Sequence, residues 1–537
     1  MKLVSVAEMQ AIEKAANEQG WTYAQMMERA GHGLAEMVQS FYGYEEDRSV
    51  IGLVGTGNNG GDTLIALAVL AQDGWQARAY LVRPRPASDH LVKRLREAGG
   101  EVVTAEEDHD FNTLDHWLES SSVLLDGILG TGFKLPLRGD AASVLRYVRA
   151  FPDLPSVVAV DCPSGVDLDT GEAAEDVIPA DLTVCMAAVK SGLLRFPAYG
   201  LAGTIEVIEI GLPVDLAEWQ AVRSEMATDE TVRPLLPKRL PDSHKGTYGT
   251  VCVLAGSLNY TGAALLCASA VLRVGAGLVQ IAAPAPLHAA LAGQIPEATW
   301  SLLPHEQGVI SRGAVEELLA NLGRANVLLM GPGFGQEETT AAFVRRLLES
   351  HGVKGRARGI GFVSASDIAD SHSAKPLPPM VIDADGLKLL ARVPAWYKKL
   401  PEGSVLTPHP GEMAILTGMT TEEVQGDRLE LARRSAIAWG LVVVLKGAMT
   451  VIAEPGGEVR VIPVATSALA HGGTGDVLAG MIAGLRAQGA GPFEAATAAA
   501  WLHAQSGLLA AQHIGHEASV LAGDLIDVLP EVLSWVW

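Results

Sequence analysis

Cysteine and metal-binding motifs are scarce in this chain. Its four cysteines, Cys162, Cys185, Cys252 and Cys267, form no CxxC pair, and its fourteen histidines form no HExxH motif. This pattern argues against a disulfide scaffold and a zinc site, and it is typical of buried cysteines in a reducing compartment. The opening residues lack a basic segment followed by an apolar one, so we expect no signal peptide and predict a cytoplasmic location.

Positive charge and long apolar runs are also in short supply. Lys and Arg total 40 against 62 Asp and Glu, which gives a formal net charge of −22. This balance argues against nucleic acid or an anionic membrane surface as the main partner. The longest apolar stretches, such as residues 261–272, are too short to span a bilayer. A small anionic ligand remains compatible with the charge, because a helix N-terminus can bind one locally.

Apolar residues are plentiful and follow an alternating pattern. Hydrophobic residues make up 48% of the 537 positions, enough to build cores for two or three domains. Short β-branched runs alternate with Ala/Leu-rich helical patterns, which is typical of βαβ units and parallel sheets. We therefore predict an α/β protein of two domains, at 1–222 and 223–537. A Gly-, Ser- and Pro-rich stretch at 351–379 lacks periodicity and predicts a long surface loop.

The first block contains a strand, a glycine turn and a helix in the segment SVIGLVGTGNNGGDTLIALAVL, residues 49–70. Its glycines allow close approach of a ligand to the backbone, and the turn faces a helix N-terminus, which favours a phosphate. The segment is neither a Walker loop nor a Rossmann fingerprint by its spacing. Taken alone, it fits a tight structural turn equally well.

Two further strand ends strengthen the prediction of a site. Asp126 follows a strand and precedes a second glycine loop, and Asp161 ends another strand, with Ser164 close behind. The carboxyl ends of parallel strands share one edge of the sheet, where ligands bind. The oxygens of Asn59, Asp126 and Ser164 could surround a hard cation at that edge.

The motifs GNNGGD, DGILGTGF and VDCPSGVD, with MMERAG near the start, resemble the N-terminal domain of bacterial bifunctional NAD(P)H-hydrate repair enzymes over about residues 1–220. The resemblance implies a Rossmann-like three-layer sandwich that epimerises the R and S hydrates of NADH and NADPH. It also implies a potassium ion held by Asn59, Asp126 and Ser164. Thr63 departs from the family, which usually has a glycine there, but a small hydroxyl should fit. The residues implied to contact the hydrate are Asn58, Asn59, Gly60, Gly61, Asp62, Gly130, Thr131, Gly132, Phe133, Lys134, Leu135, Pro136 and Asp161.

Inversion of the hydrated carbon needs proton transfer and transient loss of the hydroxyl, work that a carboxylate near the ring could do. Asp161 and Asp126 are the favoured catalytic candidates, with Lys134 as a third. The residues alone do not rank them.

The second block places four segments with polar or glycine turns after strands: HKGTYGTVCVLAGSLNYTGAALL, VLLMGPGFG, VLTPHPGEMAIL and VVVLKGAMTVIA. A fifth segment, ALAHGGTGDVLAGMIAG, carries three glycines and then Asp476 in the expected first turn of a helix. Each segment alone has an ordinary explanation: TPHPGE could be a proline turn with a capping glutamate, and Lys446 a surface lysine.

Together these segments resemble the ribokinase-like fold, and specifically the ADP-dependent NAD(P)H-hydrate dehydratases, over about residues 235–535. The resemblance implies that Asp476 deprotonates the hydroxyl of the hydrate, while glycine-loop amides stabilise the moving phosphoryl group. DADGL at 383–387 departs from the family's DADAL, and Gly386 is expected to matter little. The residues implied to contact the hydrate are Ala263, Gly333, His409, Pro410, Gly411, Glu412, Met413, Ala414, Ile415 and Asp476. Those implied to contact the nucleotide are Lys446, Gly447, Ala448, Met449, Thr450, Thr466, Ser467, His471, Gly472, Gly473, Thr474 and Gly475.

The resulting hypothesis is a bifunctional repair enzyme that epimerises the hydrates and dehydrates the S form. ADP is the expected co-substrate, with Mg2+ accompanying the nucleotide and K+ at the epimerase site. The expected partners are these small molecules and, in a homo-oligomer, further copies of the chain. Two alternatives remain: a vitamin or sugar kinase with an accessory domain, and a non-enzymatic binding scaffold in the first domain.

Overall fold

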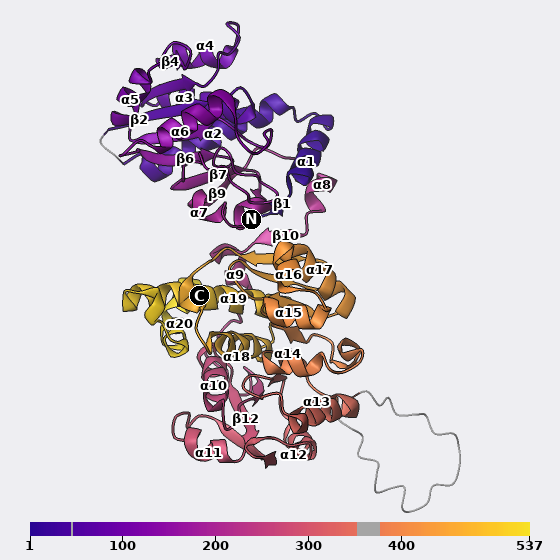
Figure 1. The fold of residues 1–537 in the computed structure, drawn as a ribbon. Helices are drawn as coiled ribbons and strands as arrows, with labels where there is room; N and C mark the ends of the chain where they lie inside the picture. Colours follow the sequence, from indigo (N-terminus) through magenta and orange to yellow (C-terminus); the bar gives the residue numbers. More distant parts are fainter. Residues whose placement is uncertain (45–46, 352–375, 537) are drawn as a thin grey trace, which may run out of the picture. The chain divides into compact units, whose positions relative to one another are not determined.

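The computed structural model describes residues 1–44, 47–351 and 376–536. The chain divides into two compact units, Met1–Met226 and Ala227–Trp537 (Figure 1). Most of the loop expected at 351–379 lies outside the described residues. All four cysteines are free and buried, as their pattern predicts. In the described part of the chain, no helix combines the length and the apolar character that crossing a bilayer requires.

The first unit is built on a seven-stranded sheet in the order β4-β3-β2-β5-β6-β7-β9, in which every neighbouring pair is parallel. The strands are β2 (Ser49–Val54), β3 (Gln76–Leu81), β4 (Glu101–Thr104), β5 (Val123–Gly127), β6 (Ser156–Val160), β7 (Leu182–Met186) and β9 (Thr204–Ile208). A separate parallel pair joins β1 (Leu3–Val4) to β8 (Val189–Lys190). The unit ends with α8 (Ala217–Gln220) and β10 (Ser224–Met226).

Helices cover both faces of this sheet, and side chains alternate between the two cores. Val50 and Val54 pack with α1 (Val6–Glu18), α2 (Tyr23–Tyr42), α3 (Asn58–Gln72) and α4 (His90–Glu97). Ile51 and Leu53 pack on the other face with α5 (Asn112–Glu119) and α6 (Gly139–Arg149). β2 is buried along its whole length, because helices cover both faces of the sheet. A strand in this position needs apolar residues at successive positions. The unit is the expected three-layer sandwich.

The second unit is also built on a largely parallel sheet, which has more strands than the first. Its strands run in the order β21-β20-β19-β18-β17-β16-β11-β12-β13, parallel from β19 to β13 and antiparallel from β19 to β21. Their bounds are β11 (Thr250–Leu254), β12 (Leu278–Pro284), β13 (Thr299–Leu303), β16 (Val327–Met330), β17 (Met380–Ile382), β18 (Val405–Leu406), β19 (Val442–Leu445), β20 (Thr450–Ala453) and β21 (Val459–Ile462). A short antiparallel hairpin pairs β14 (His305–Glu306) with β15 (Val309–Ile310).

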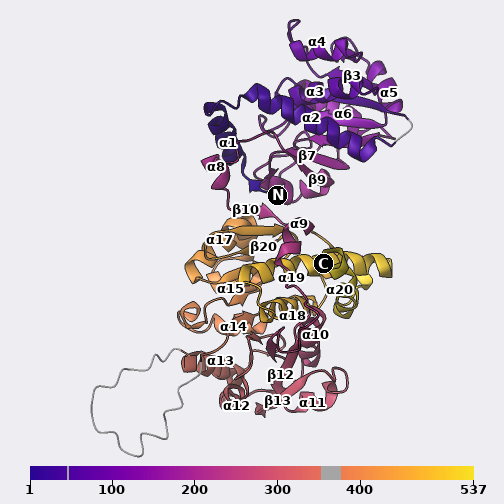
Figure 2. The same cartoon turned by 180° about the vertical axis from the view of Figure 1, so that it is seen from behind.

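Two helical layers enclose this second sheet. One contains α10 (Thr261–Arg273), α18 (Thr474–Ala487), α19 (Pro492–Ile514) and α20 (Ala522–Val536), which lie together in both views (Figures 1 and 2). The other contains α12 (Ala314–Asn321), α13 (Glu338–His351) and α14 (Asp385–Leu390). The remaining helices are α9 (Asp229–Val232), α11 (Pro286–Leu291), α15 (Pro410–Thr417), α16 (Thr421–Gly426) and α17 (Arg428–Trp439).

Each sheet has a point where the strand order reverses, and both points coincide with predicted motifs. In the first unit, β2 lies between β3 and β5; in the second, β11 lies between β12 and β16. Ligands of open α/β sheets bind outside the carboxyl ends of the strands at such a point. The glycine turn after β2 and the loops after β11 and β16 are therefore where a ligand is expected.

Candidate active sites

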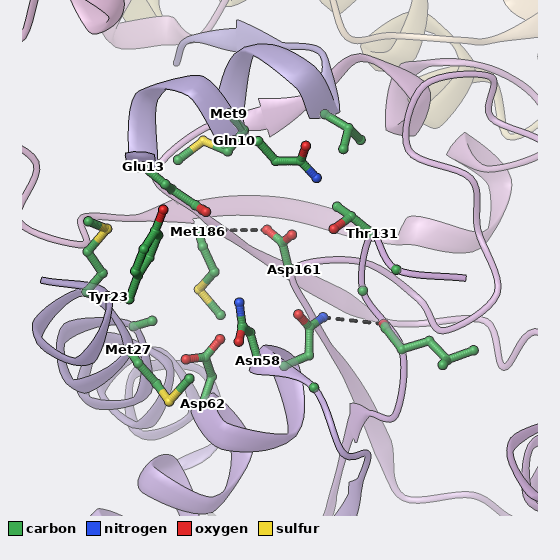
Figure 3. Close-up of a pocket in the computed structure, with 18 of the residues that line it drawn as sticks. Met9, Gln10, Glu13, Tyr23, Met27, Asn58, Asp62, Thr131, Asp161 and Met186 are labelled. Carbon is green, nitrogen blue, oxygen red and sulfur yellow. Dashed lines mark hydrogen bonds between the residues drawn. The ribbon is translucent and has the colours of Figure 1, made fainter. Parts of the chain in front are cut away.

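A cavity of about 430 Å³ opens at the reversal point of the first sheet. Its walls come from α1, α2, the start of α3, the loop after β5 and the end of β6, and Figure 3 shows Glu13, Asp62 and Asp161 directed into it from three of these elements. The sequence-predicted residues that line the cavity are Asn58, Asn59, Asp62, Gly130, Thr131, Gly132 and Asp161. The cavity therefore gathers the polar residues of three separate motifs.

The glycine turn brings backbone segments into close contact at the start of α3. A Cβ on Gly55 would overlap the carbonyl oxygen of Ile128, and one on Gly60 would overlap that of Gly55. Gly57 is the N-cap of α3, and no side chain caps the helix. The first amide groups of a 15-residue helix are thus left for a ligand, an arrangement suited to phosphate.

Asn59, Asp126 and Ser164 come together beside this turn. The amide of Ser164 donates to Oδ2 of Asp126 at 2.7 Å, and the Asn59 side-chain nitrogen donates to the carbonyl oxygens of Val160 at 2.5 Å and Leu129 at 3.3 Å. Oδ1 of Asp126 is buried without a hydrogen-bond partner. Burial raises the pKa of Asp126, against hydrogen bonding from Ser164. A buried oxygen without a donor, in a set of oxygen-bearing side chains, fits a bound cation.

Asp161 has a partner that the sequence motifs did not reveal. Its carboxylate accepts a hydrogen bond from the Met186 amide at 2.9 Å and forms a short ion pair with Lys190. Lys190 is 2% exposed and also donates to the Met186 carbonyl at 3.1 Å. Burial opposes the charge of Lys190, but the Asp161 carboxylate raises the net pKa of the lysine. The only feature of the sequence that pointed to Lys190 was its position shortly after the apolar strand segment LTVCM.

Two further acids in the cavity were not predicted to act in proton transfer. Burial, and then the charge of Asp161, raise the pKa of Asp62. Burial also raises the pKa of Glu13, against the attraction of Lys190. Glu13 comes from α1, whose sequence carries no glycine turn or strand end to attract notice. The cavity therefore combines carboxyl groups that favour protonation with one that is paired to an ammonium group.

The predicted stretch from Gly130 to Pro136 divides between two cavities. Phe133, Lys134, Leu135 and Pro136 line a second cavity of about 400 Å³, bordered also by Arg138. Leu129 lines both cavities. Lys134 thus lies apart from Asp161, and Asp126 is fully buried and does not line the first cavity.

The two departures from the family pattern behave differently. Thr63 is fully buried, and its hydroxyl donates to the Asn59 carbonyl at 2.7 Å. It fits because Gly52 and Gly127 have no side chains; a Cβ on Gly52 would lie 2.7 Å from Thr63 Cγ2. Gly386 was expected to matter little, but a Cβ there would lie 2.8 Å from the Cα atom of Gly331. The local backbone therefore requires glycine at 386.

The second site centres on the start of α18. Gly473, at φ 93°, is the N-cap of α18, and no side chain caps the helix. The Thr474 hydroxyl donates to the carbonyls of Leu469 and His471 at 2.9 Å each, which fixes the turn. Nε2 of the buried His503 lies 2.8 Å from the Thr474 carbonyl oxygen. No side chain caps this turn, and only the Thr474 amide has a backbone partner among the described residues, the His471 carbonyl oxygen at 3.4 Å; the start of α18 is thus suited to an anion.

Asp476 lies in the first turn of α18, as the sequence predicts. Burial, followed by the charge of Asp383, raises its pKa to about 7, while Lys446 acts in the opposite direction. A carboxyl group with a pKa near neutrality can accept a proton at ordinary pH and still be a base of useful strength. This is the property that a general base needs.

Lys446 lies between the α18 turn and two carboxylates. Its Nζ atom is 2.5 Å from Oδ1 of Asp383 and 3.9 Å from Oε2 of Glu412. A Cβ on Gly475 would be 3.3 Å from the same nitrogen. Arg428 holds the loop after Lys446, donating to the carbonyl oxygens of Leu445 at 3.0 Å, Lys446 at 3.1 Å and Ala448 at 2.6 Å. Asp383 was noted only as part of DADGL, without Lys446 as its partner, and Arg428 lies outside every motif that the sequence offered.

His409 and Glu412 form a cap at the start of α15. Nδ1 of His409 accepts hydrogen bonds from the amides of Gly411 at 3.0 Å and Glu412 at 3.3 Å, and Oε2 of Glu412 accepts one from the His409 amide at 3.0 Å. The capping alternative for TPHPGE is therefore present in the structure. Nδ1 is occupied as an acceptor, which leaves Nε2 to carry the proton in the neutral ring.

The remaining predicted contacts differ in exposure. Ala263 and Gly333 lie together, since a Cβ on Gly333 would be 2.8 Å from the Ala263 Cβ. Met413 is fully buried, whereas Ile415 is 52% exposed. The amide of Ser467, one of the residues predicted to contact the nucleotide, donates to Oε2 of Glu517 at 3.0 Å. Glu517 was not among the predicted residues.

The fold and these two sites define a two-unit α/β protein with one acid-lined cavity and one helix terminus that has no side-chain cap and has Asp476 in its first turn. Two family models match: "NAD(P)H-hydrate dehydratase" over residues 251–531 and "YjeF-related protein N-terminus" over residues 23–192. The chain belongs to the family of bifunctional NAD(P)H-hydrate repair enzymes, and the expected α/β fold in two units is confirmed.

Relatives of this family match along the whole chain. The bifunctional NAD(P)H-hydrate repair enzyme of Moorella thermoacetica is 36% identical and covers 99% of this chain and 97% of its own length. That of Salinibacter ruber is also 36% identical, covering 99% and 96%. Among solved structures, the ADP/ATP-dependent NAD(P)H-hydrate dehydratase of Bacillus subtilis, co-crystallised with ATP and Mg2+, is 31% identical, with a TM-score of 0.47, and covers 59% of this chain and all of that one.

Proposed function

We propose that the first unit interconverts the R and S hydrates of NADH and NADPH, and that the second unit converts the S hydrate to NAD(P)H with ADP. The observation that carries the second activity is Asp476, with a pKa of about 7, in the first turn of the uncapped helix α18 beside Lys446. Family membership along the whole chain supports both activities.

The dehydration proceeds by making the hydroxyl a better leaving group. Asp476 takes the proton from the C6 hydroxyl, whose oxygen attacks the terminal phosphorus of ADP and releases AMP. The C6 phosphate then leaves as inorganic phosphate, the ring loses a proton from C5, and the dihydronicotinamide is restored. The amides of the Gly472–Gly475 turn and Lys446 would bind the phosphoryl group as charge moves onto the leaving oxygen, a role that the uncapped start of α18 supports. Mg2+ would accompany the nucleotide and offset its negative charge.

In the first unit, Asn59, Asp126 and Ser164 would hold a potassium ion. The buried, unpaired Oδ1 of Asp126 supports this proposal, because it leaves a negative oxygen that a monovalent cation would neutralise. Bound there, the ion would order the loop that follows β5 and the turn at the start of α3. A homo-oligomeric state and a cytoplasmic location are further proposals that follow from the sequence analysis alone.

The test uses separated R and S hydrates of NADPH with the full chain. Release of NADPH from the S hydrate with ADP, and from the R hydrate only as it is converted to S, is the expected result. Replacing ADP with ATP in the same assay determines the preferred nucleotide. Phosphorylation of a vitamin or sugar, with no NADPH from either hydrate, would establish the kinase alternative instead. Dehydration without any R-to-S conversion would leave the first unit as a scaffold.

A further inference from the structure

The epimerisation proposed above needs proton transfer on both sides of the ring. For the C6–O bond to break, the departing hydroxyl must receive a proton and leave as water. The N1 lone pair then forms a double bond to C6. For the opposite configuration to form, a water molecule must add to the other face of C6 and give up a proton. One group must therefore donate and another accept, from different directions.

The titratable side chains that line the first cavity are limited in number. They are Glu13 of α1, Tyr23 of α2, Asp62 of α3, Asp161 after β6 and Lys190 of β8. Asp161 is held in place by the Met186 amide and by its ion pair with Lys190, so its carboxylate has a fixed position at the wall of the cavity. Asp126 does not line the cavity, which leaves it to the cation site.

Glu13 is the acid best placed to complement Asp161. Among the described residues, its carboxyl group makes no hydrogen bond and no ion pair within 4.0 Å, although it faces the cavity from α1 (Figure 3). The groups that face it are Asp161, Lys190 and Asp62; burial and Asp161 raise the pKa of Glu13, and Lys190 lowers it, with a net rise. A half-buried acid can also exchange its proton with solvent, whereas Asp62 is only 6% exposed.

We propose that Glu13 and Asp161 form the acid–base pair of the epimerase, acting on opposite faces of the bound ring. In one direction protonated Glu13 gives its proton to the departing hydroxyl, and Asp161 takes a proton from the incoming water. One water leaves, one water adds, and one proton passes from Glu13 to Asp161. The reverse reaction, or exchange of both protons with solvent, restores the starting state. Lys190 is a positioning residue that holds Asp161, and Asp62 donates a hydrogen bond to the substrate.

The test compares Glu13→Gln with Glu18→Gln in the full chain. Both changes replace a glutamate of α1, but Glu18 lies outside the cavity, in an exposed i,i+4 pair with Lys14 that contributes little to stability. In Glu13→Gln the kcat for R-to-S conversion should fall about 10²–10⁴-fold with a much smaller change in KM, because an amide cannot donate the acid's proton. Glu18→Gln should match the parent. Dehydration of pure S hydrate by the second unit should be unchanged in both, and thermal unfolding of the first unit should match the parent, which verifies that this unit is folded.

Two further readouts make the assignment specific. Epimerisation in ¹⁸O-labelled water should place one labelled oxygen at C6 for each inversion, and Glu13→Gln should lose labelling and inversion together. Asp62→Asn, which keeps a hydrogen-bond donor, should retain more activity than Glu13→Gln. A parent kcat in Glu13→Gln, loss confined to Asp62→Asn, or inversion without label would each overturn the acid–base pair. An inactive parent chain would instead reject the proposed epimerase, so the two failures are distinguishable.

Discussion

Nζ of Lys446 lies 2.5 Å from Oδ1 of Asp383, and Oδ2 of the same carboxylate faces Gly475 at the start of α18. This pair links the end of β17, the end of β19 and the uncapped turn at the start of α18. Asp383 is therefore a positioning residue for Lys446 and also a source of negative potential at Asp476, whose pKa it raises.

The first prediction concerns the pH profile of dehydration. A base acts in its ionised form, so the rate should fall as the pH drops through the Asp476 pKa of about 7. In Asp383→Asn a negative charge is removed while Lys446 remains, so the Asp476 pKa should fall and the acidic limb should move to lower pH. Measurements of kcat/KM with S hydrate and ADP on both sides of pH 7 test this. A limb at the same pH in parent and variant would reject the role of Asp383.

The second prediction concerns potassium. Replacing Asp126 with Ala removes the buried, unpaired oxygen, so epimerisation should fall strongly and its dependence on K+ should disappear. The measurement is the rate of R-to-S conversion against K+ concentration, with Na+ keeping the ionic strength constant. Thermal unfolding of the first unit serves as the control for folding, because dehydration reports only on the second unit. An Asp126→Ala chain that epimerises at the parent rate would remove the cation site from the mechanism.

The strand-and-helix alternation and the clustering of glycine turns were predictable because they depend on local composition and on the shared edge of a parallel sheet. Asp126 and Asp161 became candidates because each stands at the end of a strand on the shared edge of the sheet, and Asp476 because it follows a glycine turn. The contacts Asp161–Lys190 and Asp383–Lys446 were not found, since each joins residues distant in sequence. Glu13 was missed for a related reason: α1 has no unusual pattern, and only the fold brings it to the cavity.

The third prediction concerns His503, which is buried in α19 with Nε2 against the Thr474 carbonyl. Burial lowers its pKa from 6.5 to about 4, so the unfolded chain binds the proton more readily than the folded one. The contribution of the neutral, buried His503 to the free energy of unfolding is fully present above about pH 6.5. It is lost as the pH falls towards 4, a difference on the order of 3 kcal/mol.

His503→Gln keeps an N–H donor but does not titrate, so thermal unfolding of the second unit should depend less steeply on pH in this range. His503→Leu removes the donor and should slow dehydration more than His503→Gln, because the Thr474 turn is no longer held. Calorimetry across this pH range gives the first comparison, and kcat for S hydrate gives the second. Equal pH dependence in parent and His503→Gln would exclude His503 as the titrating group.

The last prediction is that Asp476→Asn separates the two activities. Asn has the size of Asp and fits the first turn of α18, so the fold should persist. An amide cannot accept the hydroxyl proton, and loss of a general base typically lowers the rate about 10²–10⁴-fold. Nucleotide binding should persist, because the Gly472–Gly475 amides and Lys446 remain. The variant is given pure R hydrate with ADP, and the R-to-S ratio and the yield of NADH are followed together. Epimerisation should proceed at the parent rate while NADH fails to accumulate; NADH formed at the parent rate would show that Asp476 is not the base and that the turn serves only to bind phosphate.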